Sequence, residues 1–518
     1  MYKVSLVMGI LVLTLFFNGC AKQQVNSTNL IAVEQIAKYK TNKKSATEIV
    51  AFDEKTNRIF STNDADNTLD IIQVIYDEKT KKAKLQLLSS IDLSKFGASV
   101  QSVAVKNSKV AAAIGSTNKI KKKGKVVVFN TNAELLSQTI VGYLPDMVTF
   151  NEDGTKILVA NEAEPDATFG KYKDVEGSIG IITLSNTDKE DNSKGYKEVT
   201  FSNANLLKSK DNTKVRLGKS NDKSLDLEPE YITVSENYAY ITLQENNALA
   251  KVDINKATLE FVKSFGVKDY TLKNKIDIEE EGKILLKNYK GLYGLYMPDS
   301  IASYKVNNKT YLVTANEGDG RTYCSKKDIN CKNPIFTDEE KISKLKLDSS
   351  LISTYQNEND LKVLTDMGDI DFDGDYDRLY AFGTRSFSIW DSNGDLIWDS
   401  LDELSILTAN YMPTLFNQDK GKMDKRSGNK GIEPEALTVG KIDEKIYAFI
   451  GLERQNAIIV YNITNPYKPS FVKYIISNSE DLSPEGMTFI SKENSPTKNA
   501  LLLVAFEGSG SIVMYEIK

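Results

Sequence analysis

The sequence predicts an all-β fold, a β-propeller, and three observations support that prediction. A short apolar strand that ends in a polar or charged residue recurs along the chain. A second strand, which begins with an acid and often with Pro before it, precedes most copies, and a third strand often follows them. Period-2 strands in meanders of three or four, repeated about every 45 residues, are typical of propeller blades.

The recurring strand predicts the number of blades. Its copies are NRIFSTND (57–64), a weaker KVAAAIGS (109–116), KILVANE (156–162), YAYITLQE (238–245), YLVTANE (311–317), LYAFGTR (379–385), YAFIGLE (447–453) and LLLVAFE (501–507). These eight copies predict eight blades. The fifth copy lacks obvious outer strands, so seven blades is the alternative.

The rest of the chain is assigned around this repeat. Residues 30–518 are predicted to form a single propeller domain, with polar insertions near 187–226, 266–296, 321–365 and 400–430. LIAVEQIAKY at 30–39 is expected to supply the missing outer strand of the last repeat and so to remove an exposed sheet edge. Two stacked β-sandwiches are the rival architecture, but they would not explain an acid pair in most repeats.

Two sets of acids recur at defined places in the repeat. The strand that opens with an acid supplies the inner-strand acids, which are Glu48, Asp146, Glu230, Asp299, Glu435 and Glu485. The recurring strand ends in the second-strand acids, which are Asp64, Glu162, Glu245, Glu317, Glu453 and Glu507. In an antiparallel pair the start of one strand meets the end of the next. We therefore expect both sets around one mouth of the central channel.

Such a ring of carboxylates needs counter-charges. Two unit charges about 4 Å apart repel by about 4 kcal/mol at an effective dielectric constant near 20. Arg321, Arg385 and Arg454 are the candidate cations within the chain, and backbone N–H groups would help. The remaining answer is a bound hard cation such as calcium, which prefers oxygen ligands. The alternative is that some acids cap turns or tie neighbouring blades together.

A separate segment, GDIDFDGDYDRLY at 368–380, has the spacing of a calcium loop. Asp369, Asp371, Asp373 and Asp377 occupy loop positions one, three, five and nine, with Gly374 at six and the carbonyl of Asp375 at seven. Tyr380 stands at position twelve, where an EF-hand has Glu, so the loop looks more like those between the strands of integrin-type propellers. A solvated acidic turn is the alternative to a calcium site.

The composition excludes several function classes. The 518 residues include no histidine, so a Ser-His-Asp triad and histidine-ligated zinc, iron or copper cannot form. A net charge of −5 speaks against nucleic-acid binding. Cys324 and Cys331 are predicted to form a disulfide, which an exported compartment permits, with two free thiols as the alternative.

The first residues resemble the signal of a bacterial lipoprotein. Lys3 precedes an apolar run at 4–17, and Asn18, Gly19 and Cys20 follow it. Residues 1–19 are therefore predicted to be a lipoprotein signal peptide, Cys20 the lipidated residue and 20–29 a tether, which would attach the protein to the membrane of the bacterial cell envelope. Ala21 after the cysteine would favour the outer membrane. A plain secretory signal is the alternative, since Phe17 departs from the usual Leu.

Several longer segments resemble a known family. They are MPDSIASY…TYLVTANEGDGR (297–321), GDYDRLYAFGTRSFSIWD (374–391), NKGIEPEALTVG (429–440) and DLSPEGMTF…LLLVAFEGSGSI (481–512). These resemble the choice-of-anchor I proteins, a group similar to the mesenchyme-specific cell-surface glycoproteins of animals, which are associated with biomineralisation. The resemblance implies an exported protein attached to a surface. Some members carry an alkaline-phosphatase label, but the histidine-based metal sites of the usual alkaline phosphatases cannot exist in this chain.

Two functions follow as hypotheses. The first is a lipid-anchored surface module that holds calcium and presents its acidic mouth to a cation, a phosphate-bearing ligand or a polymer. The second is a calcium-dependent phosphoesterase, because propeller phytases show that a calcium-loaded carboxylate rim can bind phosphate and activate water. In that case the candidate catalytic residues are Glu230, Glu245, Glu317, Arg385, Glu435, Arg454 and Glu485.

Overall fold

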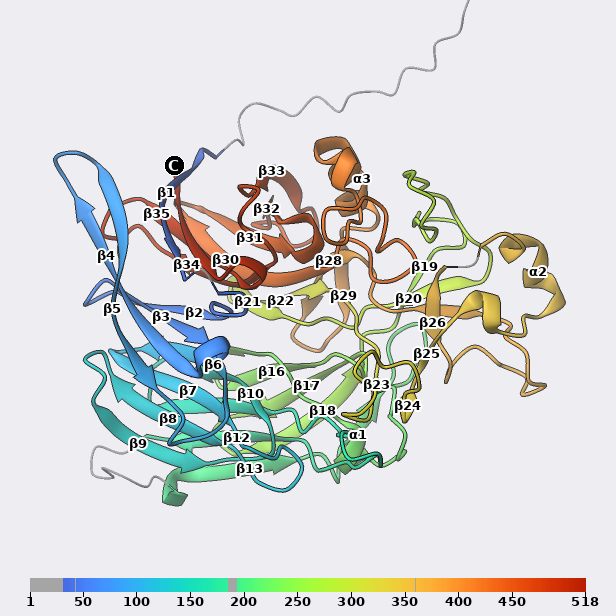
Figure 1. Cartoon of the computed structure of the whole chain (residues 1–518), viewed down its shortest axis with the longest axis horizontal. Helices are drawn as coiled ribbons and strands as arrows, with labels where there is room; N and C mark the ends of the chain where they lie inside the picture. Colours follow the sequence, from blue (N-terminus) through green and yellow to red (C-terminus); the bar gives the residue numbers. More distant parts are fainter. Residues whose placement is uncertain (1–30, 42, 185–192, 359) are drawn as a thin grey trace, which may run out of the picture. The chain divides into compact units, whose positions relative to one another are not determined.

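The computed structural model describes residues 31–41, 43–184, 193–358 and 360–518, and the predicted signal peptide, Cys20 and tether lie outside these ranges. Residues 31–518 form one compact unit. Strands dominate this unit, and its few helices are short (Figure 1). None of the helices in the described ranges is long and apolar enough to cross a membrane.

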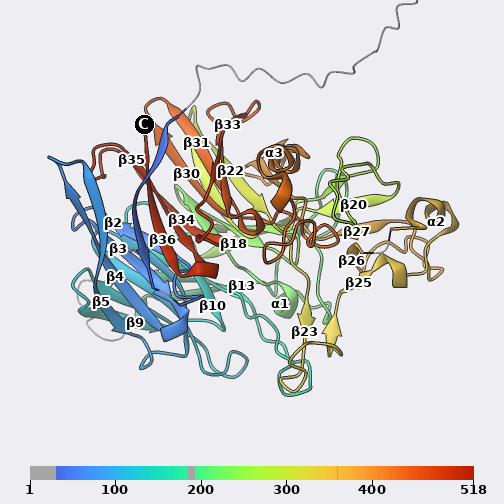
Figure 2. The ribbon, with the colours of Figure 1, turned by 45° about the horizontal axis from the view of Figure 1, so that its top comes forward.

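Seven sheets of the described residues have the predicted meander order. The first sheet consists of β2 (Val50–Asp53), β3 (Arg58–Asn63), β4 (Thr68–Asp77) and β5 (Lys82–Asp92). Figure 2 shows part of this arrangement, with the blue strands β2, β3, β4 and β5 lying side by side. The second consists of β6 (Ser99–Lys106), β7 (Lys109–Gly115), β8 (Lys125–Asn130) and β9 (Leu135–Ile140). The third consists of β10 (Pro145–Phe150), β11 (Lys156–Asn161), β12 (Ser178–Thr183) and β13 (Tyr196–Thr200). The fourth consists of β15 (Ile232–Ser235), β16 (Tyr238–Leu243), β17 (Ala248–Asp253) and β18 (Thr258–Ser264), with β14 (Leu206–Leu207) parallel to β18. The fifth consists of β21 (Ile301–Val306), β22 (Lys309–Asn316), β28 (Ser386–Asp391) and β29 (Leu396–Asp399). The sixth consists of β30 (Pro434–Ile442), β31 (Lys445–Leu452), β32 (Ala457–Asn462) and β33 (Ser470–Ile476). The seventh consists of β34 (Pro484–Ile490), β35 (Ala500–Phe506), β36 (Ser511–Ile517) and β1 (Val33–Lys40).

The first strand of each meander is the inner strand. Consecutive inner strands contact one another in the order β2, β6, β10, β15, β21, β30 and β34, and β34 contacts β2 again. This is the arrangement of a β-propeller, so the predicted fold class is confirmed.

The sixth sequence copy does not begin a sheet of its own. Its strand β27 (Leu379–Ala381) belongs to an insertion sheet, and β28 pairs with β22 of the fifth copy. The fifth copy therefore takes its outer strands from beyond a long insertion, which explains why the sequence around it lacks them. The described residues thus form seven sheets of this kind, the number of the alternative prediction.

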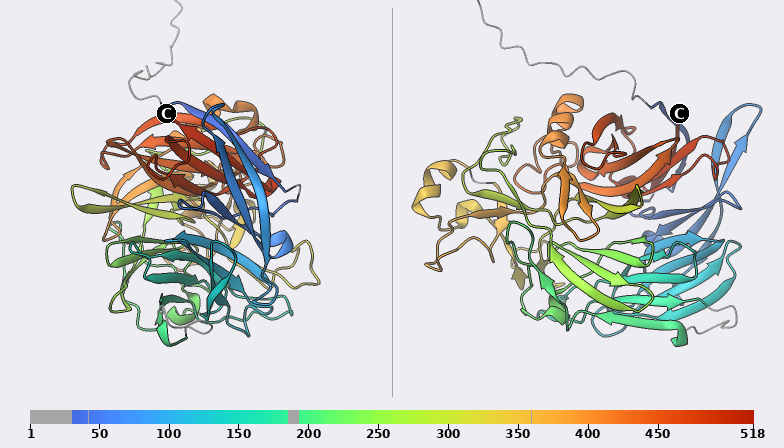
Figure 3. Two further views of the ribbon diagram at one scale, coloured as in Figure 1. Left: turned by 90° about the vertical axis from the view of Figure 1, so that its left-hand side faces the viewer. Right: turned by 180° about the vertical axis from the view of Figure 1, so that it is seen from behind.

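The N-terminal strand completes the last sheet, as the sequence predicts. β1 pairs antiparallel with β36 from Val33 opposite Ile517 to Lys40 opposite Ser511. Figure 3 shows the blue β1 beside the red C-terminal strands. The pairing covers an edge that would otherwise expose a row of unpaired backbone groups.

The insertions carry the remaining elements. One sheet has the order β19 (Val267–Asp269), β20 (Leu292–Leu295), β27, β26 (Lys362–Leu364) and β25 (Glu339–Lys341), and a hairpin joins β23 (Thr322–Tyr323) to β24 (Phe336–Thr337). Cys324 and Cys331 form a disulfide within that hairpin. The α-helices of the described residues are α1 (Lys223–Asp226), α2 (Ser349–Tyr355) and α3 (Glu403–Tyr411), and short 3-10 turns accompany them.

The core lies between neighbouring sheets and follows the two-residue period of the strands. In β35 every residue is buried. Leu502, Val504 and Phe506 pack with residues of the preceding sheet, whereas Leu501 and Leu503 pack with residues of the first sheet. Because both faces of the strand are covered, it reads as a continuous apolar run, and only its ends are free to carry polar side chains.

Candidate functional site

Three of the inner-strand acids follow prolines at irregular strand starts. The pairing register shifts between Pro145 and Val148 in β10, and likewise after Pro434 in β30 and Pro484 in β34. The residue before each of these prolines has a positive φ, between 41° and 58°. A bulge re-aims the side chain that it contains, and a non-glycine residue in this conformation costs about 1–3 kcal/mol. Asp146, Glu435 and Glu485 lie in these bulges.

A backbone hydrogen bond ties each of these bulges to the end of the second strand. The N–H of Glu162 donates to Leu144 O at 2.9 Å, and the N–H of Glu453 donates to Glu433 O at 2.9 Å. In the last sheet the N–H of Glu507 donates to Ser483 O at 3.0 Å. The start of the inner strand and the end of the second strand therefore lie at one rim in these three sheets.

Five of the six inner-strand acids line one cavity at this rim. It has a volume of about 230 Å³, and its lining includes Tyr231. Its acidic lining residues are Glu48, Asp146, Glu162, Glu230, Asp299 and Glu485. Glu435 lies beside the same group, because one oxygen each of Asp299, Glu317 and Glu435 lie within 4.8 Å of one another.

Burial and mutual repulsion raise the pKa values of these carboxyls. Burial raises the pKa of Glu48 to about 8, with added effects from Asp146, Glu507 and Asp64. Burial also raises the pKa of Asp146 to about 6. For the remaining members, burial first and neighbouring carboxylates second raise the pKa well above its usual range; these are Glu162, Glu230, Asp299, Glu435 and Glu485. The group cannot ionise fully near neutral pH without added positive charge.

Several of these carboxyls have an oxygen without a partner. Among the described residues, Oε2 of Glu230, of Glu245 and of Glu435 is buried and makes no hydrogen bond. A buried acceptor left unpaired costs about 1–3 kcal/mol. Such oxygens are therefore suited to a ligand that supplies positive charge or hydrogen-bond donors.

Three cationic side chains pair with acids close to this group, and the sequence analysis named only one of them, Arg454. Lys430 contacts the carboxylate of Glu317 and lies 3.3 Å from Asp319. Arg454 Nε lies 2.8 Å from Glu433, and Arg426 Nη2 lies 2.5 Å from the same carboxylate. Although burial raises it, these cations hold the pKa of Glu433 below its usual value.

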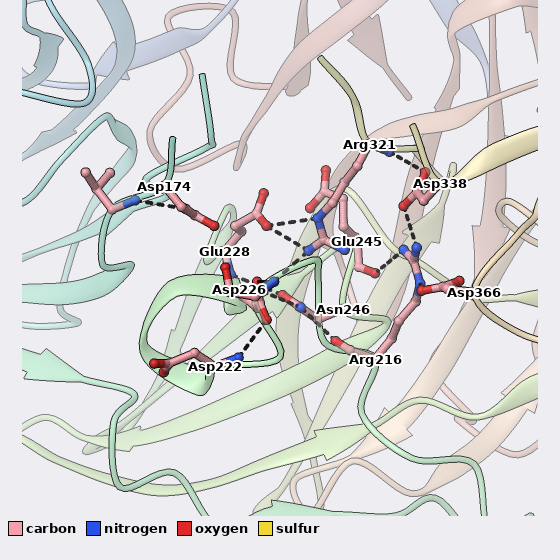
Figure 4. A network of polar contacts seen from close by, with 12 residues as sticks. Asp174, Arg216, Asp222, Asp226, Glu228, Glu245, Asn246, Arg321, Asp338 and Asp366 are labelled. Atoms are coloured by element: carbon pink, nitrogen blue, oxygen red, sulfur yellow. Dashed lines mark hydrogen bonds and ion pairs between the residues drawn. The ribbon is translucent and has the colours of Figure 1, made fainter. Parts of the chain in front are cut away.

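A buried arginine pair lies beside Glu245, and the sequence pointed to only one member of it (Figure 4). Arg321, which is 2% exposed, donates through Nη2 and Nε to Glu228 at 2.7 and 2.9 Å. Arg216 contacts Asp338, lies 2.8 Å from Asp366, and donates to the carbonyl of Glu245 at 3.0 Å. Burial and Glu228, opposed by Arg321, raise the pKa of Glu245 to about 8.

The sequence contains a pattern that identifies two acids, Glu228 and Glu433, which the sequence analysis did not select. Glu228 and Glu433 are the first acids of two Glu-Pro-Glu motifs, whose second acids are Glu230 and Glu435. The first acid of each motif binds arginine, whereas the second belongs to the acid group around the cavity. Lys430 precedes the second motif by three residues.

Not every predicted member joins the group. Arg385 is buried and donates to the carbonyls of Asp277, Ser427 and Asn429 at 2.6, 2.6 and 2.8 Å, so loop backbone rather than a carboxylate holds it. Asp64 is exposed, and Glu507 accepts a hydrogen bond from Ser45 at 3.1 Å. Glu453, by contrast, does lie close to the group, since one oxygen each of Glu317, Glu433 and Glu453 lie within 4.8 Å of one another. Burial raises the pKa of Glu453 to about 8, although its carboxylate lies 3.1 Å from Arg454.

The predicted calcium loop, residues 369–377, forms a tight turn that brings three of its five aspartates together. Asp369, Asp371 and Asp377 each offer an oxygen within 4.8 Å of the others. Gly374 N donates to Asp369 at 3.1 Å, and Oδ1 of Asp369 is buried with no hydrogen bond among the described residues. The side chain of Asp375 instead lies 3.4 Å from Lys346, and Asp373 accepts from the N–H of Asp375 at 3.1 Å.

Comparison with known proteins identifies relatives of this chain. The family model of the choice-of-anchor I domain matches residues 48–466. Gigasin-3a of Magallana gigas is 26% identical over 170 residues, which are 28% of this chain and 60% of that protein. A mesenchyme-specific cell surface glycoprotein of Strongylocentrotus purpuratus is 30% identical over 276 residues, which are 46% of this chain and 35% of that protein. The matched regions thus span less than two thirds of each relative.

Solved structures resemble the chain over most of its length. Hydrazine synthase of Kuenenia stuttgartiensis has a TM-score of 0.46 at 10% identity, covering 92% of this chain and 96% of that one. The Cps50 (Swd1) β-propeller domain of Myceliophteria thermophila has a TM-score of 0.43 at 8% identity, covering 93% and 100%.

Proposed function

Because the chain belongs to the choice-of-anchor I domain family, we propose that it is an exported cell-surface β-propeller that binds calcium and presents an acid-lined channel mouth to a ligand. The family and the fold together support a cell-surface propeller, as does the name of the sea-urchin relative. A lipid on Cys20 would attach the protein to the bacterial cell envelope, with the outer membrane as the proposed location.

The observation that carries this proposal is the approach of Asp299, Glu317 and Glu435. Their oxygens lie within 4.8 Å of one another, and Glu435 keeps a buried oxygen without a hydrogen bond among the described residues. Calcium takes six to eight oxygen ligands at about 2.3–2.6 Å and tolerates irregular geometry. The donors present are carboxylates alone, so they fit a hard cation and not a soft metal.

The loop at 369–377 is proposed as a second calcium site. Asp369, Asp371 and Asp377 would hold the ion, and the unpaired Oδ1 of Asp369 is the observation that supports it. The ion would offset the repulsion that raises the pKa of Asp371, whose causes are burial followed by Asp373 and Asp377.

Hydrolysis of phosphoesters is not the function that the geometry favours. That role requires a cation free to stabilise the charge on phosphate. Arg321 binds Glu228, Arg454 binds Glu433, and Arg385 binds backbone carbonyls. Each arginine that the sequence offers for phosphate is therefore already engaged within the protein.

Calorimetry with calcium tests the proposal. The full chain would be stripped with chelator and titrated with Ca²⁺, beside the paired variants Asp299→Asn with Glu435→Gln and Asp371→Ala with Asp373→Ala. We expect the wild type to bind at two sites and each pair to lose one of them. Asp443→Asn is the control, because this acid pairs with Lys492 at the surface. No heat of binding in the wild type, or equal binding in all variants, would contradict the proposal.

A further inference from the structure

A cavity of about 430 Å³ lies at the opposite rim from the acids. Its lining includes Ser235 at the end of β15, Lys309 at the start of β22 and Asp391 at the end of β28. These strand ends are the reverse of those that carry the acid motifs. The cavity bridges two neighbouring sheets, since its lining comes from both and β15 and β16 contact β21. It is therefore separate from the calcium sites proposed above.

The walls of this cavity are rich in tyrosine. Tyr238, Tyr240, Tyr311 and Tyr467 all line it. Tyr240 and Tyr311 are buried, whereas Tyr467 is 62% exposed and stands with its ring centroid 6.3 Å from that of Tyr311, at an angle of 82°. An exposed aromatic side chain supported by a buried one offers a rigid apolar face at low entropic cost.

Lys251 brings a polar group to this aromatic wall. Its Nζ lies 4.4 Å from the ring centroid of Tyr238 and 5.5 Å from that of Tyr240. The only hydrogen bond of this ammonium within the described ranges goes to Ser392 O at 3.3 Å. Asp391 uses Oδ1 for the N–H groups of Asn393 and Asp395, and its Oδ2 has no hydrogen bond in those ranges. Donor and acceptor capacity therefore remains on both groups.

The lining is balanced in charge. Two acids, Glu236 and Asp391, stand against two lysines, Lys251 and Lys309. This balance disfavours a strongly charged ligand and suits a neutral one with many hydroxyl groups. The volume also falls within the range of small-molecule sites, about 300–1,000 Å³, in which apolar faces and a few polar groups fix the ligand.

We infer that this cavity binds an uncharged hexose unit of a glycan. A pyranose ring has an apolar C–H face and an edge of hydroxyl groups. The apolar face packs on Tyr467 and Tyr238, and the hydroxyl groups exchange hydrogen bonds with Lys251 and Asp391. A propeller exported to a surface would in this way hold a neutral polysaccharide on the rim that faces away from its acids.

Titration with defined oligosaccharides tests this inference. The full chain, in a sugar-free detergent, would be titrated with maltohexaose, cellohexaose, the hexamer of N-acetylglucosamine and a charged hexagalacturonate, using calorimetry and saturation-transfer NMR. We expect at least one neutral hexamer to bind. Tyr467→Ala should weaken that binding by about tenfold, because the apolar face loses its stacking partner. Lys251→Met should also weaken it, and EDTA should leave it unchanged.

The controls separate this site from a general surface effect. Phe169 is 75% exposed, so Phe169→Ala removes an exposed aromatic ring elsewhere and should leave binding intact. Tyr467 is itself mostly exposed, so its variant should fold, as circular dichroism would verify. Binding of the charged hexamer alone, no binding of any neutral hexamer, or full binding by Tyr467→Ala would overturn the inference. Insensitivity to EDTA also makes its outcome independent of the calcium proposal.

Discussion

Lys430 places its ammonium against the carboxylate of Glu317, so one of the three acids of the proposed calcium site, Asp299, Glu317 and Glu435, carries a counter-ion from within the chain. Lys430→Met should destabilise the calcium-free protein by about 3–5 kcal/mol, because it leaves a buried charge unpaired. Added calcium should then raise the melting temperature of the variant more than that of the wild type, as scanning calorimetry would measure. Lys492→Met, at an exposed pair, is the control. Equal protection of both proteins by calcium would contradict the role given to Lys430.

Glu435 is expected to lower the stability of the folded protein in the absence of metal. Glu435→Gln keeps the shape but removes a carboxyl whose ionisation burial and neighbouring carboxylates oppose, so it should stabilise the calcium-free protein and weaken ion binding at the proposed site. Terbium luminescence measures the binding, because Tyr231 lines the acid cavity and is placed to sensitise the ion. Tyr231→Phe should lower the emission without lowering affinity. Glu444→Gln, whose side chain is 97% exposed, should change neither stability nor emission, and the same result for Glu435→Gln would refute its role.

The loop at 369–377 should depend on calcium for its order. Asp371→Asn removes one of its three converging carboxylates and should lower the calcium stoichiometry by one while leaving the terbium emission of Tyr231 unchanged. Arg378 follows the loop directly and is exposed, so trypsin should cleave there faster after chelation. Calcium should protect the wild type and not the variant. A cleavage rate in the wild type that does not change with calcium would contradict calcium binding at this loop.

The stability of the calcium-free protein should fall as the pH rises. Burial raises the pKa of Glu48 from 4.5 to about 8 and that of Asp146 from 3.8 to about 6. The folded state therefore binds more protons than the unfolded state between about pH 4 and pH 8, and the free energy of unfolding decreases across that window. Urea denaturation in EDTA should show a loss on the order of 2 kcal/mol attributable to Glu48, which Glu48→Gln removes. Glu54→Gln, at an exposed site, should keep the full pH dependence.

The buried pair of Arg321 and Glu228 should act as a structural tie. Arg321→Met alone should cost about 3–5 kcal/mol of unfolding free energy, because it leaves the carboxylate of Glu228 buried without its partner. The double change with Glu228→Gln should recover much of this loss. By contrast, separating the exposed pair of Lys492 and Asp443 should cost less than about 1 kcal/mol. A small effect of Arg321→Met would show that Glu228 is satisfied in another way.

Repeat spacing is sufficient to predict the propeller and the rim at which its acid motifs meet. An inner strand that begins at Pro145 and a second strand that ends near Glu162 must return to the same end of an antiparallel pair. The closing role of β1 follows equally, since the last repeat supplies only three strands of its sheet, β34, β35 and β36. These predictions depend only on local periodicity.

The features of the fold and the site that could not be predicted from the sequence depend on contacts with or across the insertions. Arg385 ends a repeat like the glutamates, yet the carbonyls of Asp277 and Ser427, from two insertions, hold its guanidinium. The pairing of β22 with β28 likewise spans the insertion that separates them, so counting copies gave one sheet too many. In the second Glu-Pro-Glu motif, Glu433 binds arginines and Glu435 does not. This difference could not be predicted without knowing where Arg426 and Arg454 lie in the fold.

The central claim is that carboxylates at the acid rim hold a hard cation, and an anomalous difference map tests it most directly. Crystals of the full chain grown with calcium or terbium would be measured at a wavelength where the ion scatters anomalously. The account predicts one peak within about 2.3–2.6 Å of oxygens of Asp299, Glu317 and Glu435, and a second among Asp369, Asp371 and Asp377. A map at saturating ion that shows no peak near Asp299 and Glu435 would contradict it.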